Sequence, residues 1–256
     1  MPSSLQRHVV CVGDSLTTGQ VSVNYVKTLA ARDLGCPVSF TNAGVNGDLA
    51  FNVLERLDSV IDLQPDAITV LIGTNDANAS LSEKNVRMMT RMKKLPRRPS
   101  IAWFGENLTA IVDRLTTETQ ARVAVLSLPV LGQELGSDSV QRSADYSTLI
   151  KHIADERRVT YLPLHERQLA YLTAGGFPPG IRFRDGRILS ATAAMQHFVL
   201  RRSFDGISGR RGLQLTTDFI HQNTRGASMI VDLIVHFLTQ NQADSQHRHS
   251  GGPSTL

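Results

Sequence analysis

Residues 9–19 read VVCVGDSLTTG, an apolar run that stops at a small turn carrying an acid and a hydroxyl. The β-branched run predicts a strand, and its nearly continuous apolarity is typical of a strand covered on both faces. The turn that follows, with Asp14 and Ser15, suits three roles: a phosphate cradle, an ordinary helix cap or the seat of a nucleophile. The rest of the chain decides among them, because a nucleophile needs partners.

Strand patterns and amphipathic helical patterns alternate along the chain. Strands are predicted at 8–12, 38–42, 67–72, 122–128 and 159–164, and helices at 20–34, 51–63, 101–118, 143–157 and 226–239. Alternation of this kind indicates a parallel sheet with helices on both sides. We therefore expect an α/β fold, a three-layer α/β/α sandwich around a parallel five-stranded sheet.

Two long segments, 77–99 and 172–215, interrupt the alternation. Residues 83–98 hold seven basic residues against one acid, and residues 182–211 hold seven arginines against two aspartates. The net charge is only +4, so the rest of the chain is acidic overall. Each insert follows a predicted strand, and ligands of an open parallel sheet bind beyond the carboxyl ends of its strands. We therefore expect both inserts at the functional edge, as lid or binding elements.

The bulk properties are those of a soluble globular protein, with 256 residues, 41% hydrophobic and 20% charged. We assign residues 1–239 to a single domain and the polar, aperiodic residues 240–256 to a disordered tail. No run approaches the ~18 apolar residues of a membrane span. No apolar signal segment precedes the first strand, so the chain is expected to be cytoplasmic if Met1 is the native start. Cys11 and Cys36 are then expected to be reduced thiols.

Three further polar blocks follow predicted strands or precede the last helix. They are NAGVNGD at 42–48, GTND at 73–76 and DFIHQN at 218–223. A serine that attacks an ester needs a base to take its proton and a carboxylate to orient that base. Asp218 lies three residues before His221, so it can hold the imidazole nitrogen that faces away from the serine. Ser15, Asp218 and His221 are therefore the candidate nucleophile, acid and base.

Together with GDSL at 13–16, these blocks stand in the order of the SGNH (GDSL) hydrolase family, which the chain resembles from residue 8 to about residue 239. The resemblance implies a flavodoxin-like sheet and a serine esterase or lipase that cleaves a carboxylic ester or thioester through an acyl-enzyme. It implies no metal and no other cofactor. It also implies an oxyanion hole made of the N–H of Ser15, the N–H of Gly47 and the side-chain amide of Asn75.

Some residues leave alternatives open. Gly44 competes with Gly47 for the oxyanion role, and the family pattern favours Gly47 because it stands in the GD pair. The next residue is Leu49, where many members have Ser or Thr, which leaves the hydrogen bonding there undetermined. Asp244 and His247 repeat the D-x-x-H spacing in the tail, whereas the family places its acid and base before the last helix.

Plainer interpretations exist for each site residue. Ser15 could only cap the next helix, and Asn75 could be a simple turn residue. Asp14 is interpreted as structural, bonding loop amides rather than reacting. Taken singly, these interpretations are the more common ones, but the four blocks in order favour catalysis.

The inserts suggest what the substrate could be. Residues 86–95 form a basic amphipathic pattern that includes Met89 and Met92, which predicts either a solvated helix covering the sheet or a lid that meets an acyl chain. Residues 175–187 predict an irregular loop that carries Arg182 and Arg184. If both segments border the nucleophile, the entrance would be positive and would favour anionic esters such as acyl-phospholipids or acyl-CoA thioesters. Such a surface would also suit peripheral contact with a membrane.

Other functions remain open at this stage. An acyltransferase would use the same triad and deliver the acyl group to an alcohol instead of water. A flavodoxin-like module would bind phosphate or flavin at GDSLTTG, but it leaves Asn75, Asp218 and His221 without a role. Nucleic-acid binding is not expected, because aromatic residues are not interleaved with the basic ones. No metal site is expected, since His247 and His249 have no further ligands nearby. The oligomeric state is left open.

Overall fold

A computed structural model describes residues 6–177, 181, 183 and 186–249, of which 186–188 and 241–249 are described by their backbone alone. Its centre is a five-stranded sheet with the order β2-β1-β3-β4-β5, in which every neighbouring pair is parallel. The strands are β1 Arg7–Gly13, β2 Val38–Gly44, β3 Ala67–Leu71, β4 Arg122–Leu126 and β5 Thr160–Leu162. The expected α/β fold with a parallel five-stranded sheet is confirmed.

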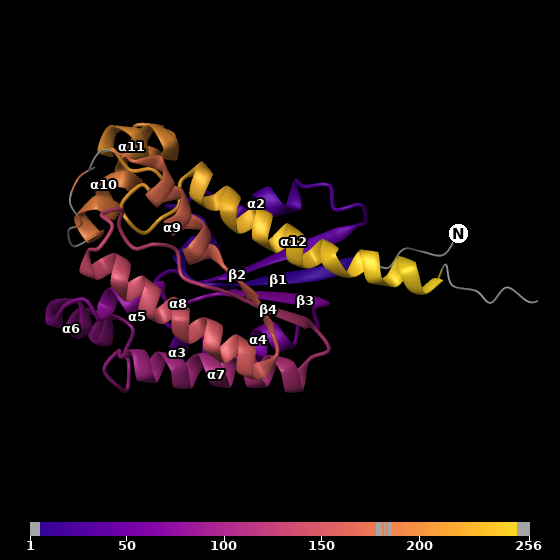
Figure 1. Cartoon of the computed structure of the whole chain (residues 1–256). Coiled ribbons are helices and arrows are strands. Elements are labelled where there is room, and N and C mark those ends of the chain that lie inside the picture. The colour runs from indigo at the N-terminus through magenta and orange to yellow at the C-terminus, as the bar shows by residue number, and fades with distance from the viewer. Residues whose placement is uncertain (1–5, 178–180, 182, 184–185, 250–256) are drawn as a thin grey trace, which may run out of the picture.

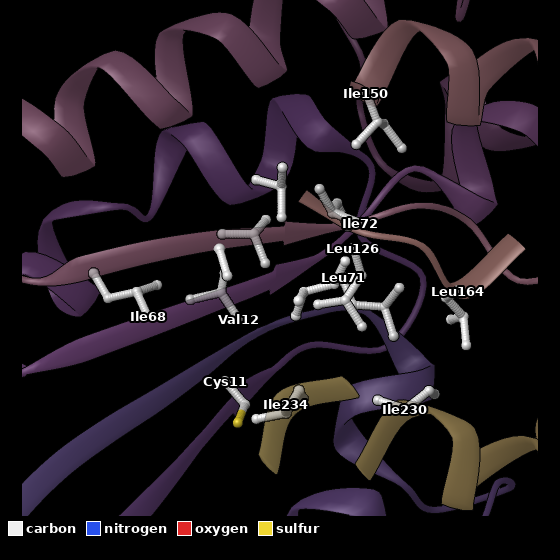
Figure 2. Close-up of a cluster of buried hydrophobic side chains, with 14 of the residues drawn as sticks. Cys11, Val12, Ile68, Leu71, Ile72, Leu126, Ile150, Leu164, Ile230 and Ile234 are labelled. Carbon is white, nitrogen blue, oxygen red and sulfur yellow. The ribbon is translucent and has the colours of Figure 1, made fainter. Parts of the chain in front are cut away.

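Helices cover both faces of this sheet (Figure 1). Helices α2 (Tyr25–Ala30), α9 (Leu164–Gly175) and α12 (Thr224–His249) lie on one side, and α3 (Ala50–Glu55), α4 (Asp58–Ile61), α7 (Ile101–Glu118) and α8 (Asp138–Arg157) on the other. The core lies on both faces of the strands, with Ile150 of α8 above them and Ile230 and Ile234 of α12 below them in Figure 2. All five residues of β3, AITVL, are buried, as its nearly continuous apolar sequence predicts.

The remaining helices are α1 (Ser15–Thr18), α5 (Thr74–Ala79), α6 (Glu83–Met92), α10 (Gly186–Phe198) and α11 (Phe204–Arg211). The first insert thus holds the end of α5 and all of α6, and the second holds the end of α9 followed by α10 and α11. Both inserts lie at the carboxyl end of the sheet, α6 on one side and α10 and α11 on the other (Figure 1). The loop predicted at 175–187 lies in part outside the described residues.

Some predicted boundaries differ from the structure. The helix expected at 51–63 is divided into α3 and α4, and α9 follows β5 where no helix was expected. The last helix is predicted to end at 239, whereas α12 continues to His249. Neither glycine nor proline occurs between residues 227 and 250, and nothing in that sequence stops a helix.

Parallel pairing brings the ends of three strands to one place. Gly13 of β1 is in register with Gly44 of β2 and with Leu71 of β3. The three sequence blocks that follow these strands therefore start side by side at one edge. No helix in the part of the chain that the structure describes is long and apolar enough to cross a membrane.

Candidate active site

The turn after β1 is a compact cap for a single helical turn. Asp14 Oδ1 accepts a hydrogen bond from the backbone N–H of Leu16 at 2.9 Å, and Ser15 is the first residue of α1. Gly13 permits this close turn, because a Cβ there would lie 2.2 Å from Thr17 Oγ1. An anion at this helix end would meet the Asp14 carboxyl group, which already accepts the hydrogen bond of the Leu16 N–H. The turn is therefore poorly suited to cradle a phosphate.

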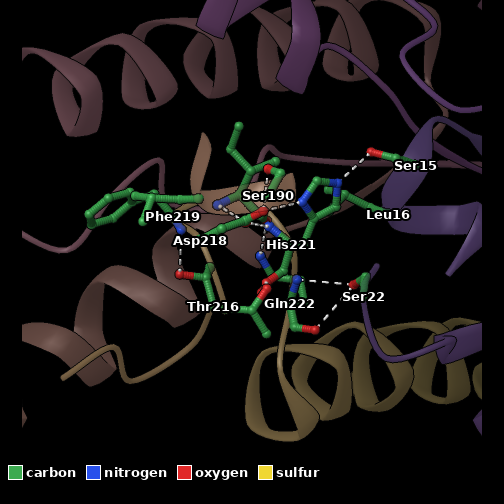
Figure 3. Close-up of polar contacts among 12 residues, drawn as sticks. Ser15, Leu16, Ser22, Ser190, Thr216, Asp218, Phe219, His221 and Gln222 are labelled. Carbon is green, nitrogen blue, oxygen red and sulfur yellow. Dashed lines mark hydrogen bonds and ion pairs between the residues drawn. The ribbon is translucent and has the colours of Figure 1, made fainter. Parts of the chain in front are cut away.

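Ser15, His221 and Asp218 form a continuous hydrogen-bonded chain (Figure 3). Ser15 Oγ lies 3.0 Å from His221 Nε2, and His221 Nδ1 lies 2.7 Å from Asp218 Oδ2. Ser15 is partly buried, while Asp218 is fully buried and His221 is 8% exposed. The base thus faces the serine with one ring nitrogen and the carboxylate with the other, which is the arrangement that serine nucleophiles require.

The electrostatics of this pair favour a charged carboxylate beside a basic imidazole. Burial alone would raise the pKa of Asp218, but the charge of His221 and hydrogen bonds from His221 and Ser190 outweigh it and hold that pKa below its ordinary value. Burial would lower the pKa of His221, yet the Asp218 carboxylate raises it above its ordinary value. Asp218 therefore stays ionised and stabilises the imidazolium that forms when His221 takes a proton.

The turn that carries the acid and the base is fixed by its own backbone. Asp218 Oδ1 accepts hydrogen bonds from the N–H groups of Ile220 at 3.2 Å and His221 at 2.8 Å. Phe219, the residue that follows Asp218, has φ 78°, a left-handed conformation that is unfavourable for a bulky residue. Its ring is buried and contacts Phe183 at 5.3 Å between ring centroids. The packing of this buried ring stabilises the unfavourable backbone conformation of Phe219.

Ser190 of α10 is a site residue that sequence reasoning missed. Its hydroxyl donates a hydrogen bond to Asp218 Oδ2, the same oxygen that faces His221. Nothing in the local sequence, RILSATA, distinguishes this serine, and the sole indication was that the second insert should reach the functional edge.

The candidate oxyanion donors converge on the same place. Ser15, Gly47 and Asn75 all line one cleft together with His221. The structure also distinguishes Gly44 from Gly47. The Gly44 N–H donates a hydrogen bond to Asn42 Oδ1 at 3.0 Å, and a Cβ on Gly44 would lie 2.4 Å from the Thr18 backbone nitrogen. Gly44 is a close-packing glycine with an occupied N–H, which leaves Gly47 as the candidate donor.

Asn75 is held by two acceptors. Its Nδ2 donates to the carbonyl oxygen of Asp48 at 3.0 Å and to Asp14 Oδ2 at 3.2 Å. The amide has two hydrogens, so an oxyanion must share or displace one of these bonds. The longer bond, to Asp14, is the one more easily exchanged, and burial raises the pKa of that carboxyl to about 7.

The loop that carries Gly47 is clamped by cations that the sequence did not single out. Asp48 is buried and is bound by Arg56 Nε at 2.8 Å and by Lys93 Nζ at 3.0 Å. Arg56 also donates to the carbonyl oxygens of Gly13 at 3.1 Å and Ala43 at 3.0 Å. Next to Asp48, the Leu49 side chain is fully buried with Met89 and other apolar residues, so packing takes the place of a side-chain hydrogen bond there.

The cleft has a volume of about 340 Å³ and one strongly apolar wall. That wall is made of methionines on one side of α6: Met88, Met89 and Met92. No lysine or arginine lines the cleft among the described residues, and Arg182 and Arg184, predicted at the entrance, lie outside them. Within the first insert, Arg97 pairs with Glu106 and Arg98 with Glu83. The described part of the chain therefore gives no support to a positive entrance.

No group of three or more His, Cys, Asp and Glu side chains that could hold a metal ion occurs in the part of the chain described here. Within the described residues, neither Cys11 nor Cys36 forms a disulfide.

Known proteins share sequence or fold with this chain. The family described as GDSL-like Lipase/Acylhydrolase matches residues 11–227. No curated protein sequence matches the chain.

Several solved structures share the fold at low sequence identity. The acetylxylan esterase Axe2 from Geobacillus stearothermophilus is 14% identical with a TM-score of 0.62, over 91% of this chain and 95% of that one. The acetyl xylan esterase AlAXEase is 17% identical with a TM-score of 0.64, over 89% and 97%. The lipase/acylhydrolase from Enterococcus faecalis is 19% identical with a TM-score of 0.59, over 92% and 97%. Since the family match spans most of its length, the chain belongs to the GDSL-like lipase/acylhydrolase family and is an SGNH-type carboxylic ester hydrolase.

Proposed function

We propose that this enzyme hydrolyses esters of apolar carboxylic acids, with Ser15 as the nucleophile, and that the acyl group lies against the methionine wall of α6. The observation that carries this proposal is that the Ser15–His221–Asp218 chain opens into a cleft whose walls include three methionines and no lysine or arginine among the described residues. An uncharged, apolar acyl chain fits this lining better than an anion does.

In the first half of the reaction, Ser15 Oγ attacks the ester carbonyl and gives its proton to His221 Nε2. The negative charge on the carbonyl oxygen is received by the N–H groups of Ser15 and Gly47 and by the Asn75 amide. Asp218 stabilises the imidazolium, which then protonates the departing alcohol and leaves an acyl-enzyme. In the second half, His221 takes a proton from water as the water oxygen attacks the acyl carbon. The carboxylic acid then departs as His221 gives this proton back to Ser15 Oγ.

Methionine side chains suit an acyl site, because they are flexible and adapt to chains of different length. The acetylxylan esterases are similar in fold alone, so their acetyl substrates carry no weight for this chain. We expect kcat/KM to rise from acetate to butyrate and octanoate esters, as more methylene groups contact Met88, Met89 and Met92.

The test is a series of p-nitrophenyl esters of increasing chain length, assayed with the wild type, Ser15→Ala and Met92→Gln. Met92 is chosen because it is 51% exposed, so a polar replacement spares the core. We expect Ser15→Ala to abolish turnover. Met92→Gln should lower the octanoate-to-acetate ratio of kcat/KM by about fivefold, a loss of the order of one buried methylene group.

Met195→Gln is the matched control, because Met195 is 54% exposed on α10 and does not line the cleft. Its ratio should stay at the wild-type value. Turnover that survives in Ser15→Ala would refute the nucleophile. An acetate preference, left unchanged by Met92→Gln, would refute the methionine acyl site while leaving the triad intact.

A further inference from the structure

The first insert reaches the candidate oxyanion loop through one lysine. Lys93, directly after α6, donates from Nζ to the carbonyl oxygen of Asn46 at 2.7 Å and to Asp48 Oδ1 at 3.0 Å. Its side chain is 18% exposed, and its stem lies over Gly47, where a Cβ would come within 3.0 Å of Lys93 Cε. One ammonium group therefore holds the loop on both sides of Gly47.

Residues 45–48 form a β-turn that can exist in two states. The Asp48 N–H donates to the Val45 carbonyl oxygen at 3.2 Å, and Gly47, third in the turn, has φ 74°. A positive φ there is that of a type II turn. A type I turn differs by about 150° in the preceding ψ and about 170° in this φ, which turns the peptide between the two central residues over. Glycine makes both states accessible, since it has no Cβ to forbid either.

The peptide that turns over is the one that carries the oxyanion donor. In a planar trans peptide the carbonyl oxygen of Asn46 and the N–H of Gly47 point in opposite directions. A cation that binds the Asn46 oxygen therefore also fixes the direction of the Gly47 N–H. If the peptide turned over, a carbonyl oxygen would take the place of the N–H and repel the developing oxyanion.

We propose that Lys93 is a positioning residue that locks the peptide between Asn46 and Gly47, so that the Gly47 N–H stays directed at the oxyanion. This inference rests on the proposed function for the role of Gly47. Lys93 is not among the residues that line the cleft, so it acts through the peptide rather than on the substrate. Its charge also polarises the carbonyl group, which strengthens the N–H as a donor.

Removal of Lys93 should release this peptide without unfolding the loop. Arg56 still binds the other oxygen of Asp48 at 2.8 Å and ties it to the ends of β1 and β2. Lys93→Met keeps the length of the stem that covers Gly47 and removes only the cation. Lys94→Met is the matched control, because Lys94 is the exposed neighbour and the same charge is lost from the same segment.

The first experiment compares kcat and KM of the two variants on one ester. Loss of one oxyanion donor costs about 10²–10³ in kcat, and a donor that is misdirected part of the time should cost about 10- to 100-fold. We expect that loss in Lys93→Met with KM and the melting temperature near their wild-type values, no loss in Lys94→Met, and partial recovery in Lys93→Arg. Equal kcat in Lys93→Met and Lys94→Met would overturn the proposal, as would a loss confined to KM.

A second readout does not depend on activity. The dipeptide Asn-Gly occurs once in the chain, so ¹³C-asparagine and ¹⁵N-glycine labelling isolates the amide signal of Gly47. This signal should shift or broaden in Lys93→Met and remain unchanged in Lys94→Met; an unchanged signal in Lys93→Met would overturn the lock. If the signal responds but the wild type hydrolyses no ester, the proposed function fails and the lock stands. If Ser15-dependent hydrolysis is normal and Lys93→Met keeps full kcat, the lock alone fails.

Discussion

Two turns at the same edge of the sheet each bury an aspartate near His221, and the two carboxyl groups respond in opposite ways. Asp14, in the turn after β1, is 1% exposed, and burial raises its pKa to about 7. Asp218, in the turn before α12, is equally buried, yet its pKa lies below its ordinary value because the charge and hydrogen bonds of His221 and a bond from Ser190 outweigh burial.

The difference lies in the donors around each carboxyl group. Asp14 accepts one backbone N–H, from Leu16, and a longer bond from the Asn75 amide. Asp218 accepts two backbone N–H groups, the imidazole of His221 and the hydroxyl of Ser190. Equal burial thus gives one carboxylate that can hold a cationic imidazole and another that gives up its charge near neutral pH. The first suits catalysis and the second suits a scaffold.

The largest expected effect is on Asp218. Asp218→Asn removes the charge that stabilises the imidazolium and allows an amide to hold the wrong tautomer of His221, so kcat should fall by about 10⁴-fold. Steady-state kinetics at pH 8 measures this loss. A fall of less than tenfold would mean that the two turns do not differ in the way proposed.

Asp14→Asn should act on stability instead. A carboxyl group whose folded pKa is raised favours the folded state when protonated, so its contribution falls as pH rises from about 4 to about 7 and remains unfavourable above that. The variant lacks this penalty. The variant should therefore have a greater free energy of unfolding than the wild type. This gain should be larger at pH 8 than at pH 5, by about 2 kcal/mol. Urea denaturation at both pH values measures this, and a difference independent of pH would contradict it.

Ser190→Ala tests the donor that comes from the second insert. Loss of one hydrogen bond to the Asp218 carboxylate is worth about 1 kcal/mol, so kcat should fall by roughly fivefold. Without this donor the pKa of Asp218 rises and its carboxylate attracts the imidazolium more strongly, so the acidic limb of the pH–rate profile should move to higher pH. Ser190→Thr keeps the hydroxyl and should recover part of the rate, whereas loss of rate without movement of the limb would indicate a role outside this bond.

The smallest expected effect is that of the Asp14 charge, in one turn, on the pKa of His221, in the other. His221 must be neutral to take the proton of Ser15, so kcat/KM should rise with pH through a pKa above the ordinary 6.5, and Asp14 contributes to that elevation. Asp14→Asn removes this negative charge, and the acidic limb should therefore move to lower pH by less than one unit. A shift to higher pH would contradict the electrostatic coupling.

Local sequence predicted the sheet and the central site because both depend on short-range patterns. Runs rich in β-branched and apolar residues predicted the five strands, and Ser15, Gly47 and Asn75 stand within four residues of strand ends that parallel pairing brings together. The oxyanion roles of Gly47 and Asn75 came from the family resemblance. Ser190, Arg56 and Lys93 could not be predicted in this way, because each reaches the site from a distant segment through a single side chain. The structure shows that two of these, Ser190 and Lys93, come from the inserts.

The predicted end of the last helix is wrong for another reason. Apolar periodicity stops at residue 239, but α12 continues to His249 through a polar sequence that contains no glycine or proline. The expected preference for anionic esters rested on the basic residues of the two inserts and on their predicted place beside Ser15. Three of these cations are held in ion pairs, Lys93 with Asp48 and Arg97 and Arg98 with glutamates.

The central claim is that Ser15, activated by His221 and Asp218, is the residue that becomes covalently acylated. Incubation with diethyl p-nitrophenyl phosphate followed by intact-protein and peptide mass spectrometry tests this directly, because the serine oxygen displaces p-nitrophenolate and retains the diethylphosphoryl group. We expect one adduct per chain, on the peptide that contains Ser15, absent in Ser15→Ala and much slower to form in Asp218→Asn. An adduct that persists in Ser15→Ala, or one that forms at the wild-type rate in Asp218→Asn, would contradict it.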